Sequence, residues 1–288
     1  MAGSTSTQEA VGVIGLGIIG SRVAENVRSH GARVYVWSRR ERPVANFLAT
    51  PAEVAEQAEV IQIFVRDGRA LLEMLDAMQP ALTKRHLVMN HATVLPADAR
   101  EAARRCEACG AGFLDAPFTG SKNAAAAGKL CYYVAGPETL RRRALPILRW
   151  SGEKILPMGE VGDASVVKIA TNLVTAAIVK ALAEAASITR AEGVDLLRLK
   201  EAFENNANYS PLIGMKLPAM MAGDFEAHFS LDNMLKDVDF GLQLAAGQGV
   251  AAPVIAAAAD GLRERLQAGE GDLDFAVVGR GVAPGGNL

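Results

Sequence analysis

A glycine-rich turn near the amino terminus constrains the fold more than any other feature of this sequence. Residues 10–14 are a short apolar run typical of a buried strand, and Gly15-Leu16-Gly17-Ile18-Ile19-Gly20 follows directly, before a helical pattern of apolar residues. In such a unit the first glycine permits a tight turn, the second lets the backbone approach a pyrophosphate, and the third allows close packing of helix on strand. A second apolar run follows at residues 33–37. We therefore predict that residues 15–20 bind a dinucleotide; a purely structural glycine turn is the alternative.

Strand and helix patterns continue to alternate beyond this unit. Strands are predicted at residues 60–65, 87–90, 113–116, 130–135 and 154–158, with helices at 70–78 and 97–109. This alternation predicts an α/β Rossmann fold with a doubly wound parallel sheet. Because ligands of such sheets bind outside the carboxyl ends of the strands, we expect three loops to converge on the cofactor: residues 65–68, which include Val65 and Arg66, residues 90–93 and residues 117–122. His91 in the second loop is a candidate general base or a structural residue.

The end of the second predicted strand bears on the choice of cofactor. NAD-binding proteins usually place an acid there to hold the ribose 2′-hydroxyl, whereas this chain has Ser38, Arg39 and Arg40. Two guanidinium groups and a hydroxyl suit a 2′-phosphate, through charge-assisted hydrogen bonds and stacking on the adenine. The pattern favours NADP(H) over NAD(H); an exposed arginine loop without a ligand is the alternative.

The remainder of the chain is predicted to be helical. Residues 162–192 read as one long helix with Asp163 as its N-cap, and further helices are predicted at 196–203, 211–221, 231–248 and 252–266. This gives a dinucleotide-binding domain at residues 1–161 and an all-α substrate and oligomerisation domain at residues 162–288. The polar leader and the glycine-rich residues 279–287 are predicted to be frayed.

Lys168 and Asn172 stand out on the long helix. They are four residues apart and so lie on one face of an otherwise apolar helix, where an ammonium and an amide need polar surroundings. A wet cleft or a bound ligand would supply them. The alternative is a solvated stripe that these two residues form with Lys180 and Glu184.

Composition excludes several classes of function. The chain has 288 residues with 30 Lys and Arg against 32 Asp and Glu, which gives no reason to expect binding to nucleic acid or to an anionic membrane. Its three cysteines are too few for a disulfide framework, and Cys106 and Cys109 have no second pair to complete a zinc site, so no metal is predicted. Without a signal-peptide pattern or a long uncharged apolar run, the chain is expected to be soluble and cytoplasmic, with small-molecule partners.

Four blocks of the sequence resemble the β-hydroxyacid dehydrogenase family, which includes 3-hydroxyisobutyrate dehydrogenase and the glyoxylate or succinic semialdehyde reductases. The resemblance runs nearly end to end. The blocks are the glycine turn, Asp115-Ala116-Pro117-Phe118-Thr119-Gly120-Ser121 with Gly128-Lys129-Leu130, the run from Gly162 through Lys168 to Asn172, and Phe229-Ser230-Leu231-Asp232-Asn233-Met234-Leu235-Lys236-Asp237.

The resemblance implies a Rossmann domain of the 6-phosphogluconate dehydrogenase type, joined to an all-α domain through the long helix. It implies that Lys168 is the catalytic lysine, with Asn172 beside the substrate, and that Thr93 and Lys236 approach the nicotinamide. It also implies that Thr119, Gly120 and Ser121 hold the substrate carboxylate, and that the chain forms a homodimer or homotetramer. Lys122 would add a positive charge for an acidic substrate, or is an exposed loop lysine.

The reaction implied by this resemblance is hydride transfer between NADP(H) and a small semialdehyde or 2-oxo acid, or the corresponding hydroxy acid. For Lys168 to act as general acid and base near neutral pH, its pKa must fall from about 10.4. Desolvation, a second cation such as Lys236, or the positive nicotinamide would each lower it.

The sequence departs from the usual pattern of the family at three places. Ala92 replaces a usual serine, Ile19 replaces a usual methionine, and the usual Ser-Gly-Gly of the substrate loop reads Thr119-Gly120-Ser121-Lys122-Asn123.

Three alternatives to this reaction remain. An imine reductase would resemble the same family, but it typically carries another residue at the position of Lys168. A 6-phosphogluconate dehydrogenase would have a much longer helical part and a His-Asn pair after the lysine, where this chain has Ile169-Ala170-Thr171-Asn172. A non-catalytic NADP-binding sensor or scaffold would have lost the lysine.

Overall fold

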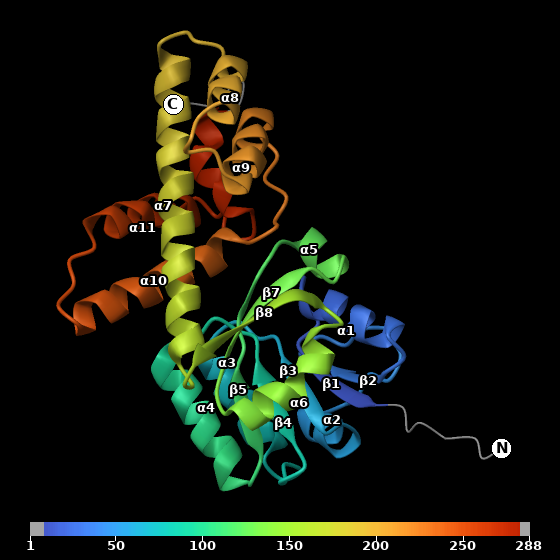
Figure 1. The fold of residues 1–288 in the computed structure, drawn as a ribbon. Coiled ribbons are helices and arrows are strands. Elements are labelled where there is room, and N and C mark those ends of the chain that lie inside the picture. Colours follow the sequence, from blue (N-terminus) through green and yellow to red (C-terminus); the bar gives the residue numbers. More distant parts are fainter. Residues whose placement is uncertain (1–8, 283–288) are drawn as a thin grey trace. The chain divides into compact units, whose positions relative to one another are not determined.

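The structure, a computed structural model, describes residues 9–282, and these form two compact units that divide between Lys168 and Ile169 (Figure 1). The division falls inside the helix α7 (Asp163–Ala191), whereas the predicted domain boundary after residue 161 coincides with the start of that helix. The leader up to residue 8 and residues 283–287, both predicted to be frayed, lie outside the described residues.

The first unit is built on a sheet whose first five strands are parallel, in the order β2-β1-β3-β4-β5. These strands are β1 (Ala10–Ile14), β2 (Arg33–Trp37), β3 (Val60–Ile63), β4 (Leu87–Asn90) and β5 (Gly112–Asp115). The helices between them are α1 (Gly20–Ser29), α2 (Pro51–Gln57), α3 (Gly68–Met78) and α4 (Pro96–Ala108). The predicted doubly wound α/β sheet is confirmed, and only α2 among these elements was not predicted. The strand order reverses between β1 and β3, which creates a ligand-binding crevice at their carboxyl ends.

The other edge of the sheet is mixed. β7 (Leu130–Ala135) pairs antiparallel with β5, the two-residue strand β6 (Phe118–Thr119) pairs antiparallel with β7, and β8 (Gly152–Gly159) runs parallel to β7. The expectation of a parallel strand is wrong for β7, and β6 lies in residues that were predicted to be a loop. A parallel pair needs a crossover helix, and the link after β5 contains only β6 and the five-residue α5 (Lys122–Ala126). The helix α6 (Glu138–Leu148) connects β7 to β8.

Apolar side chains cover both faces of this sheet. Val13 and Ile14 are adjacent on β1 and fully buried, yet they belong to two different hydrophobic clusters. Successive side chains of a strand point to opposite faces, so an uninterrupted apolar run predicts a strand that is buried on both sides. This packing fixes the loops at the carboxyl edge.

The second unit is helical. Its elements besides α7 are α8 (Leu196–Glu204), α9 (Pro211–Ala222), α10 (Leu231–Gly247), α11 (Pro253–Gln267) and the 3-10 segment η1 (Phe275–Val282). The four α-helices were predicted to within two residues. The prediction that residues 279–282 are frayed is wrong, because Gly279 and Val282 are buried and a Cβ on Gly279 would lie 2.6 Å from the sulfur of Met220.

A buried ion pair ties η1 to the rest of the helical unit. Lys216 Nζ lies 2.6 Å from Asp274 Oδ1, and both side chains are almost fully buried. Asp274 Oδ2 also accepts hydrogen bonds from the backbone N–H groups of His228 (3.1 Å) and Phe229 (3.2 Å). The loop that precedes α10 is thereby fixed.

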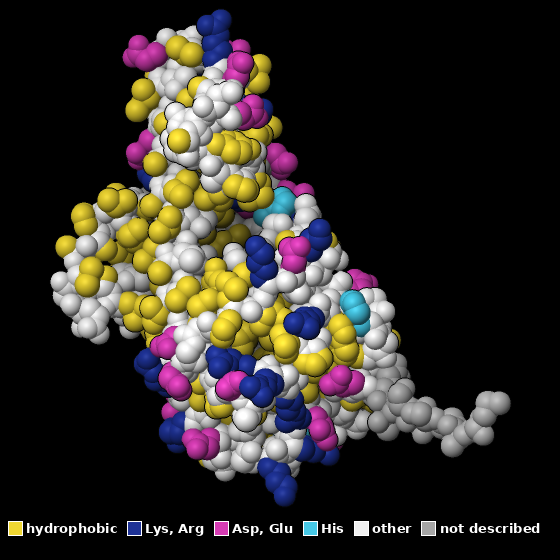
Figure 2. Space-filling view, viewed as in Figure 1, with side chains coloured by type: hydrophobic (Ala, Val, Ile, Leu, Met, Phe, Trp, Pro, Cys, Tyr) yellow, Lys and Arg dark blue, Asp and Glu magenta, His cyan; other side chains and the backbone are white. Residues whose placement is uncertain are grey.

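Among the described residues, α7 alone is long and apolar enough to cross a membrane, by length and composition only. Ala176, Val179 and Ala186 on one face of α7 pack into the core of the helical unit, so we interpret α7 as a core helix. Other apolar side chains of this unit are exposed, including Val174 and Ile188. Apolar side chains gather on the surface of the helical unit (Figure 2).

Candidate active site

The glycine turn lies at the crevice between β1 and β3. Gly15 has a φ of 98°, and a Cβ there would lie 1.9 Å from the carbonyl oxygen of Phe64. A Cβ on Gly20 would lie 2.0 Å from the carbonyl oxygen of Gly15. No side chain fits at either position, so both glycines are needed to form the turn itself.

Gly17 is different, because no atom lies within 4 Å of the position that a Cβ would occupy. The residue is exposed, and the following helix α1 starts without a side-chain cap and without an acid in its first turn. An open backbone next to a helix N-terminus suits a phosphate group, which this helix end attracts electrostatically. Residues 15–20 therefore fit the pyrophosphate of a dinucleotide. Within them, Leu16 is buried and Ile18 is largely exposed.

The predicted 2′-phosphate residues follow β2, on the adjacent strand. The Ser38 hydroxyl donates to the carbonyl oxygen of Arg40 at 2.5 Å, which shapes the loop. Arg39 and Arg40 are exposed, and residues 9–282 give neither guanidinium a hydrogen-bond or ion-pair partner. Both are thus available to an anionic group.

The loops after β3 and β4 also begin at this edge. Val65 is partly buried and Arg66 is exposed. The Asn90 side chain donates to the carbonyl oxygen of Ala92 at 3.1 Å and accepts from the N–H of Ala92 at 3.0 Å, which closes the turn that carries the partly buried Thr93.

His91 is enclosed between the strands. Its Nδ1 lies 2.6 Å from the carbonyl oxygen of Ala116 and its Nε2 lies 3.1 Å from Gln62 Oε1. Its ring also stacks on Phe64, with 4.6 Å between the ring centroids. Burial lowers the pKa of His91 to about 4, so the ring is neutral at physiological pH. These contacts favour the structural alternative over the general base.

The predicted substrate loop connects β6 to α5. Thr119 and Gly120 are exposed, and Lys122 is partly buried. Ser121 Oγ accepts a hydrogen bond from Ala124 N at 3.2 Å, as the cap of α5. Gly120 has a φ of 141°, and a Cβ there would lie 2.8 Å from Leu130.

A hydrogen bond holds this loop to the helix of the glycine turn. Asn26 Nδ2 on α1 donates to the carbonyl oxygen of Ala125 on α5 at 2.7 Å. The link places α5, which directly follows the substrate loop, beside α1. The glycine turn and the substrate loop thus lie in one fixed part of the first unit.

Lys168 lies in the second turn of α7 and is partly buried. The prediction that Asp163 caps this helix is wrong: Asp163 is its first residue, and its carboxylate accepts from Glu160 N at 2.9 Å. The first turn is bound instead by Asp115, at the carboxyl end of β5, which accepts from Ser165 N at 3.0 Å. Because Asp115 comes from a distant strand, local sequence reasoning could not find this cap.

Asn172 lies one turn beyond Lys168 and belongs to the helical unit. Its Nδ2 donates to Asp237 Oδ2 at 2.6 Å, and Asp237 Oδ1 lies 2.5 Å from Lys236 Nζ. Asn172 is buried, which contradicts the alternative of a solvated stripe for this residue, whereas Lys180 pairs with Glu184 at the surface.

Asp237 was not among the predicted site residues, although it closes the fourth block of the resemblance. Its carboxylate forms an ion pair with Lys236, the residue named above as a second cation that would lower the pKa of Lys168. The signal in the sequence that could have identified Asp237 was an acid directly after a lysine on a helix with a buried face.

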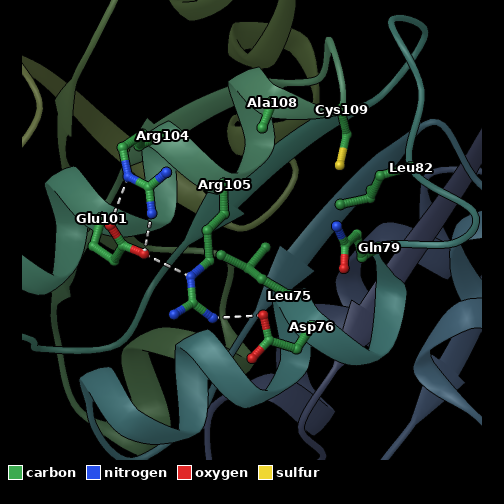
Figure 3. Close-up of a pocket in the computed structure, with 9 residues that line it drawn as sticks. All are labelled: Leu75, Asp76, Gln79, Leu82, Glu101, Arg104, Arg105, Ala108 and Cys109. Atoms are coloured by element: carbon green, nitrogen blue, oxygen red, sulfur yellow. Dashed lines mark hydrogen bonds and ion pairs between the residues drawn. The ribbon is translucent and has the colours of Figure 1, made fainter.

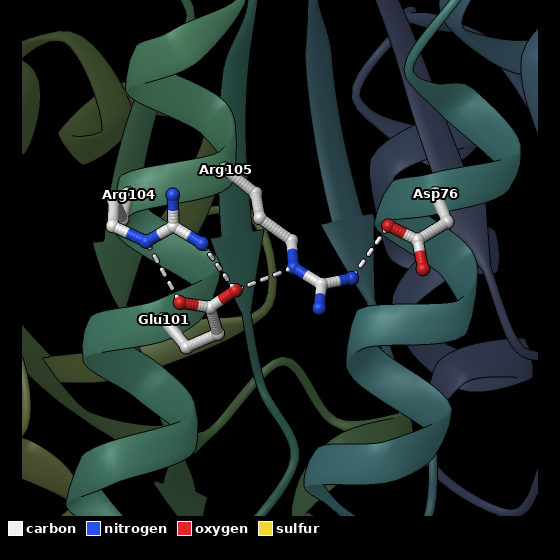
Figure 4. Close-up of polar contacts among 4 residues, drawn as sticks. All are labelled: Asp76, Glu101, Arg104 and Arg105. Atoms are coloured by element: carbon white, nitrogen blue, oxygen red, sulfur yellow. Dashed lines mark hydrogen bonds and ion pairs between the residues drawn. The ribbon is translucent and has the colours of Figure 1, made fainter.

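A surface groove between α3 and α4 contains none of the predicted site residues. Figure 3 shows its lining: Leu75, Asp76, Gln79, Leu82, Glu101, Arg104, Arg105, Ala108 and Cys109. Arg105 bridges Glu101 (2.8 Å) and Asp76 (2.5 Å), and Arg104 also pairs with Glu101 (Figure 4). Hydrogen bonds from both arginines lower the pKa of Glu101 to about 2. The charges compensate one another, so we interpret this network as a link between the two helices.

The neighbouring cysteines show no sign of a reactive or metal-binding pair. Burial raises the pKa of the Cys106 thiol to about 12, which keeps it protonated. Within the described residues no group of His, Cys, Asp and Glu is placed to hold a metal ion.

Comparison with known proteins agrees with this architecture. Residues 10–159 match the family described as the NAD binding domain of 6-phosphogluconate dehydrogenase, and residues 162–280 match that described as NAD-binding of NADP-dependent 3-hydroxyisobutyrate dehydrogenase. Glyoxylate/succinic semialdehyde reductase 2 of Arabidopsis thaliana is 26% identical over 279 residues, which are 93% of this chain and 78% of that protein.

Two solved structures extend the comparison. The 3-hydroxyisobutyrate dehydrogenase of Mycobacterium tuberculosis with L-serine has a TM-score of 0.84 at 26% identity, covering 94% of this chain and 98% of its own. An imine reductase variant from Myxococcus stipitatus has a TM-score of 0.62 at 22% identity, covering 95% and 99%, which is a likeness of fold alone.

Proposed function

This chain belongs to the β-hydroxyacid dehydrogenase family, and we propose that it transfers a hydride between NADP(H) and a small semialdehyde or 2-oxo acid, or the corresponding hydroxy acid. The observation that carries the proposal is the placement of Lys168 in the first unit. Lys168 lies one turn after Ser165, which is bound to the carboxyl end of β5, and the glycine turn follows β1 at the same edge of the sheet.

The cofactor would be held by backbone and side chains of the first unit. Gly17 and the N-terminus of α1 would receive the pyrophosphate, and Arg39 and Arg40 would bind the 2′-phosphate of NADP(H). The Ser38 hydroxyl would join them by exchanging its bond to the carbonyl oxygen of Arg40 for one to the phosphate. When bound, the nicotinamide ring supplies or accepts the hydride. Arg39 and Arg40, to which the described residues 9–282 supply no partner, support NADP(H) over NAD(H), because an unphosphorylated ribose offers them no anion.

Lys168 would move the proton. In the reductive direction its ammonium gives a proton to the carbonyl oxygen, and in the oxidative direction its neutral amine takes the proton of the hydroxyl. Asn172 would orient the reacting oxygen or the lysine. Because Asn172 Nδ2 donates to Asp237, the orientation of the amide on this face of α7 is fixed.

The substrate loop would hold a carboxylate. Thr119 and Gly120 are exposed residues, so the Thr119 hydroxyl and the Gly120 N–H are candidate donors. Ser121 accepts from Ala124 N through its oxygen, so its hydroxyl hydrogen can still be donated. Lys122 would add a positive charge. Thr93 and Lys236 would approach the nicotinamide.

The test is NADPH oxidation by the purified protein with glyoxylate, succinic semialdehyde, methylmalonate semialdehyde, tartronate semialdehyde or a cyclic imine. We expect turnover with at least one aldehyde or oxo acid, and a loss of about 10²–10⁴-fold in kcat for Lys168→Ala with unchanged NADPH affinity. Lys180→Ala is the matched control, since Lys180 lies on the same helix and pairs at the surface with Glu184. Retained turnover in Lys168→Ala would remove the lysine from the mechanism.

Two other outcomes separate the alternatives. Turnover of the cyclic imine alone would favour an imine reductase. Tight NADPH binding without turnover of any of these substrates would favour a sensor or scaffold.

Oligomeric state and location complete the proposal. Exposed Val174, Ile188 and Val254 on the helical unit support a homodimer or homotetramer that forms through this unit. Light scattering coupled to gel filtration gives the mass of the assembly, and a monomer at micromolar concentration would contradict it. The sequence features described above support a cytoplasmic location, which fractionation of the source cells would test.

A further inference from the structure

Asp115 is a buried carboxylate that takes no part in the proton or hydride transfer proposed above. It lies at the carboxyl end of β5 with no exposed surface. Burial raises the pKa of this carboxyl group, whereas hydrogen bonds from Ser165 and Gly162 act in the opposite direction, since they stabilise its ionised form.

The carboxylate is bound to the start of the helix that carries Lys168. Asp115 Oδ2 accepts from Gly162 N at 3.2 Å and from Ser165 N at 3.0 Å, and the Ser165 hydroxyl donates to both carboxylate oxygens at 3.0 and 2.9 Å. The first N–H groups of a helix have no partner within the helix and need an acceptor. Here a distant strand supplies it, together with a negative charge that favours this end of the helix dipole.

The chain leaves little room for another arrangement at this point. Gly162 has a φ of 101°, and a Cβ there would lie 3.2 Å from the guanidinium of Arg100. The positive φ therefore makes position 162 unfavourable for the Ser, Thr, Asp or Asn that would cap a helix locally. The carboxylate of Asp163 accepts from Glu160 N instead.

The bond to Ser165 has a direct consequence for Lys168. The two residues are three positions apart on one rigid helix, a rise of about 4.5 Å. Asp115 also pairs in register with Asn90 on β4, and the Asn90 side chain closes the turn leading to Thr93. One buried residue thus lies between two segments that carry predicted site residues.

We propose that Asp115, through Ser165, is a positioning residue that holds Lys168 at the distance and orientation needed for proton transfer. The proposal rests on the role of Lys168 given under Proposed function. It assigns Asp115 to the rate of the chemical step and not to binding, because a displacement of about 1 Å at a reacting group can lower a rate about 100-fold while the ligand contacts persist.

The kinetic test compares Ser165→Ala and Asp115→Asn with the unaltered protein, on the substrate that it turns over. Ser165→Ala removes the hydroxyl but keeps both backbone N–H groups, so it is the variant expected to fold. We expect the single-turnover rate of hydride transfer, followed by NADPH absorbance, to fall by about 10–100-fold, with the Kd for NADPH unchanged. His86→Gln is the control, because His86 is also buried, but its ring is hydrogen-bonded to Thr83 and, at 2.8 Å, to the carbonyl oxygen of Ala55 rather than to the start of α7.

A second measurement does not depend on turnover. Hydrogen exchange of the backbone amides of residues 162–168 is expected to accelerate in Ser165→Ala and Asp115→Asn but not in His86→Gln. Absence of turnover in the unaltered protein would then count against the proposed function, while the exchange still reports on this contact. Faster exchange with an unchanged rate of hydride transfer, or no change in exchange, would overturn the positioning role. An equal loss of the hydride-transfer rate in His86→Gln and in Ser165→Ala would also overturn the positioning role.

Discussion

Asp237 Oδ2 accepts a hydrogen bond of 2.6 Å from Asn172 Nδ2, and this joins α10 to α7 within the helical unit. The other carboxylate oxygen pairs with Lys236 at 2.5 Å. The two helices approach closely because α10 has a glycine at 241, where a Cβ would lie 2.4 Å from Leu173. A single carboxylate therefore sets the orientation of the amide that we place beside the substrate.

Replacing this carboxylate should destabilise the protein and impair catalysis. We expect Asp237→Asn to lower the free energy of unfolding by about 3 kcal/mol, because it leaves a nearly buried Lys236 ammonium without its charge partner. The orientation of Asn172 would be lost as well, so kcat should also fall. Urea denaturation gives the first quantity and steady-state kinetics the second.

Asp239→Asn is the matched control for this prediction. Asp239 lies on the same helix and pairs with Arg263 at 2.6 Å, but both side chains are more than 40% exposed. Such surface pairs contribute about 0–1 kcal/mol. Equal stability of the two variants would contradict the role given to Asp237.

The open space at Gly17 gives a second prediction. Gly17→Ala should leave the melting temperature almost unchanged, since no atom lies within 4 Å of the new methyl group. It should weaken NADPH binding about tenfold or more, because the methyl group would occupy the space of the pyrophosphate. Fluorescence titration measures the affinity. Gly247→Ala also meets no atom within 4 Å and should bind NADPH normally; equal affinity in the two variants would place the cofactor elsewhere.

The arginines after β2 give a third prediction, on cofactor choice. Arg39→Ala and Arg40→Ala should each lower kcat/KM for NADPH about tenfold, the loss of one charge-assisted hydrogen bond, and leave kcat/KM for NADH unchanged. Arg42→Ala, in the same exposed loop, is the control. If kcat/KM falls equally for NADPH and NADH in these variants, the arginines do not bind the 2′-phosphate.

Local sequence patterns were sufficient to predict most of the fold and the glycine turn at residues 15–20. The apolar run at residues 10–14 defines the strand, and Gly15 and Gly20 define the turn that follows it because neither position has room for a side chain, so this part was predictable. The helices of the second unit follow from apolar periodicity in the same way.

What could not be predicted depends on pairs that are distant in sequence. The cap of α7 comes from Asp115, 50 residues before Ser165, and the partner of Asn172 is Asp237, 65 residues later. Antiparallel pairing of β7 is set by the short link after β5, and burial of η1 depends on Lys216 binding Asp274. No local pattern encodes which distant acid meets which amide or lysine.

His91 gives the last prediction, on acid stability. Its pKa is lowered from 6.5 to about 4 in the folded chain, so between these pH values the unfolded chain binds a proton that the folded chain does not. Stability must therefore rise with pH in this interval: the contribution of neutral His91 is fully present above pH 6.5 and is lost as the pH falls toward 4. At roughly 1.4 kcal/mol for each pH unit, the interval from 6.5 to about 4 corresponds to about 3 kcal/mol.

Urea denaturation between pH 4 and 7 measures this loss. In His91→Gln the dependence of unfolding free energy on pH should flatten by close to one proton, although the variant is less stable at pH 7 because packing against Phe64 is lost. His30→Gln, at an exposed position, should retain the full dependence of the unaltered protein. An unchanged slope in His91→Gln would mean that His91 accepts a proton inside the fold, and its role would then return to that of a candidate acid or base.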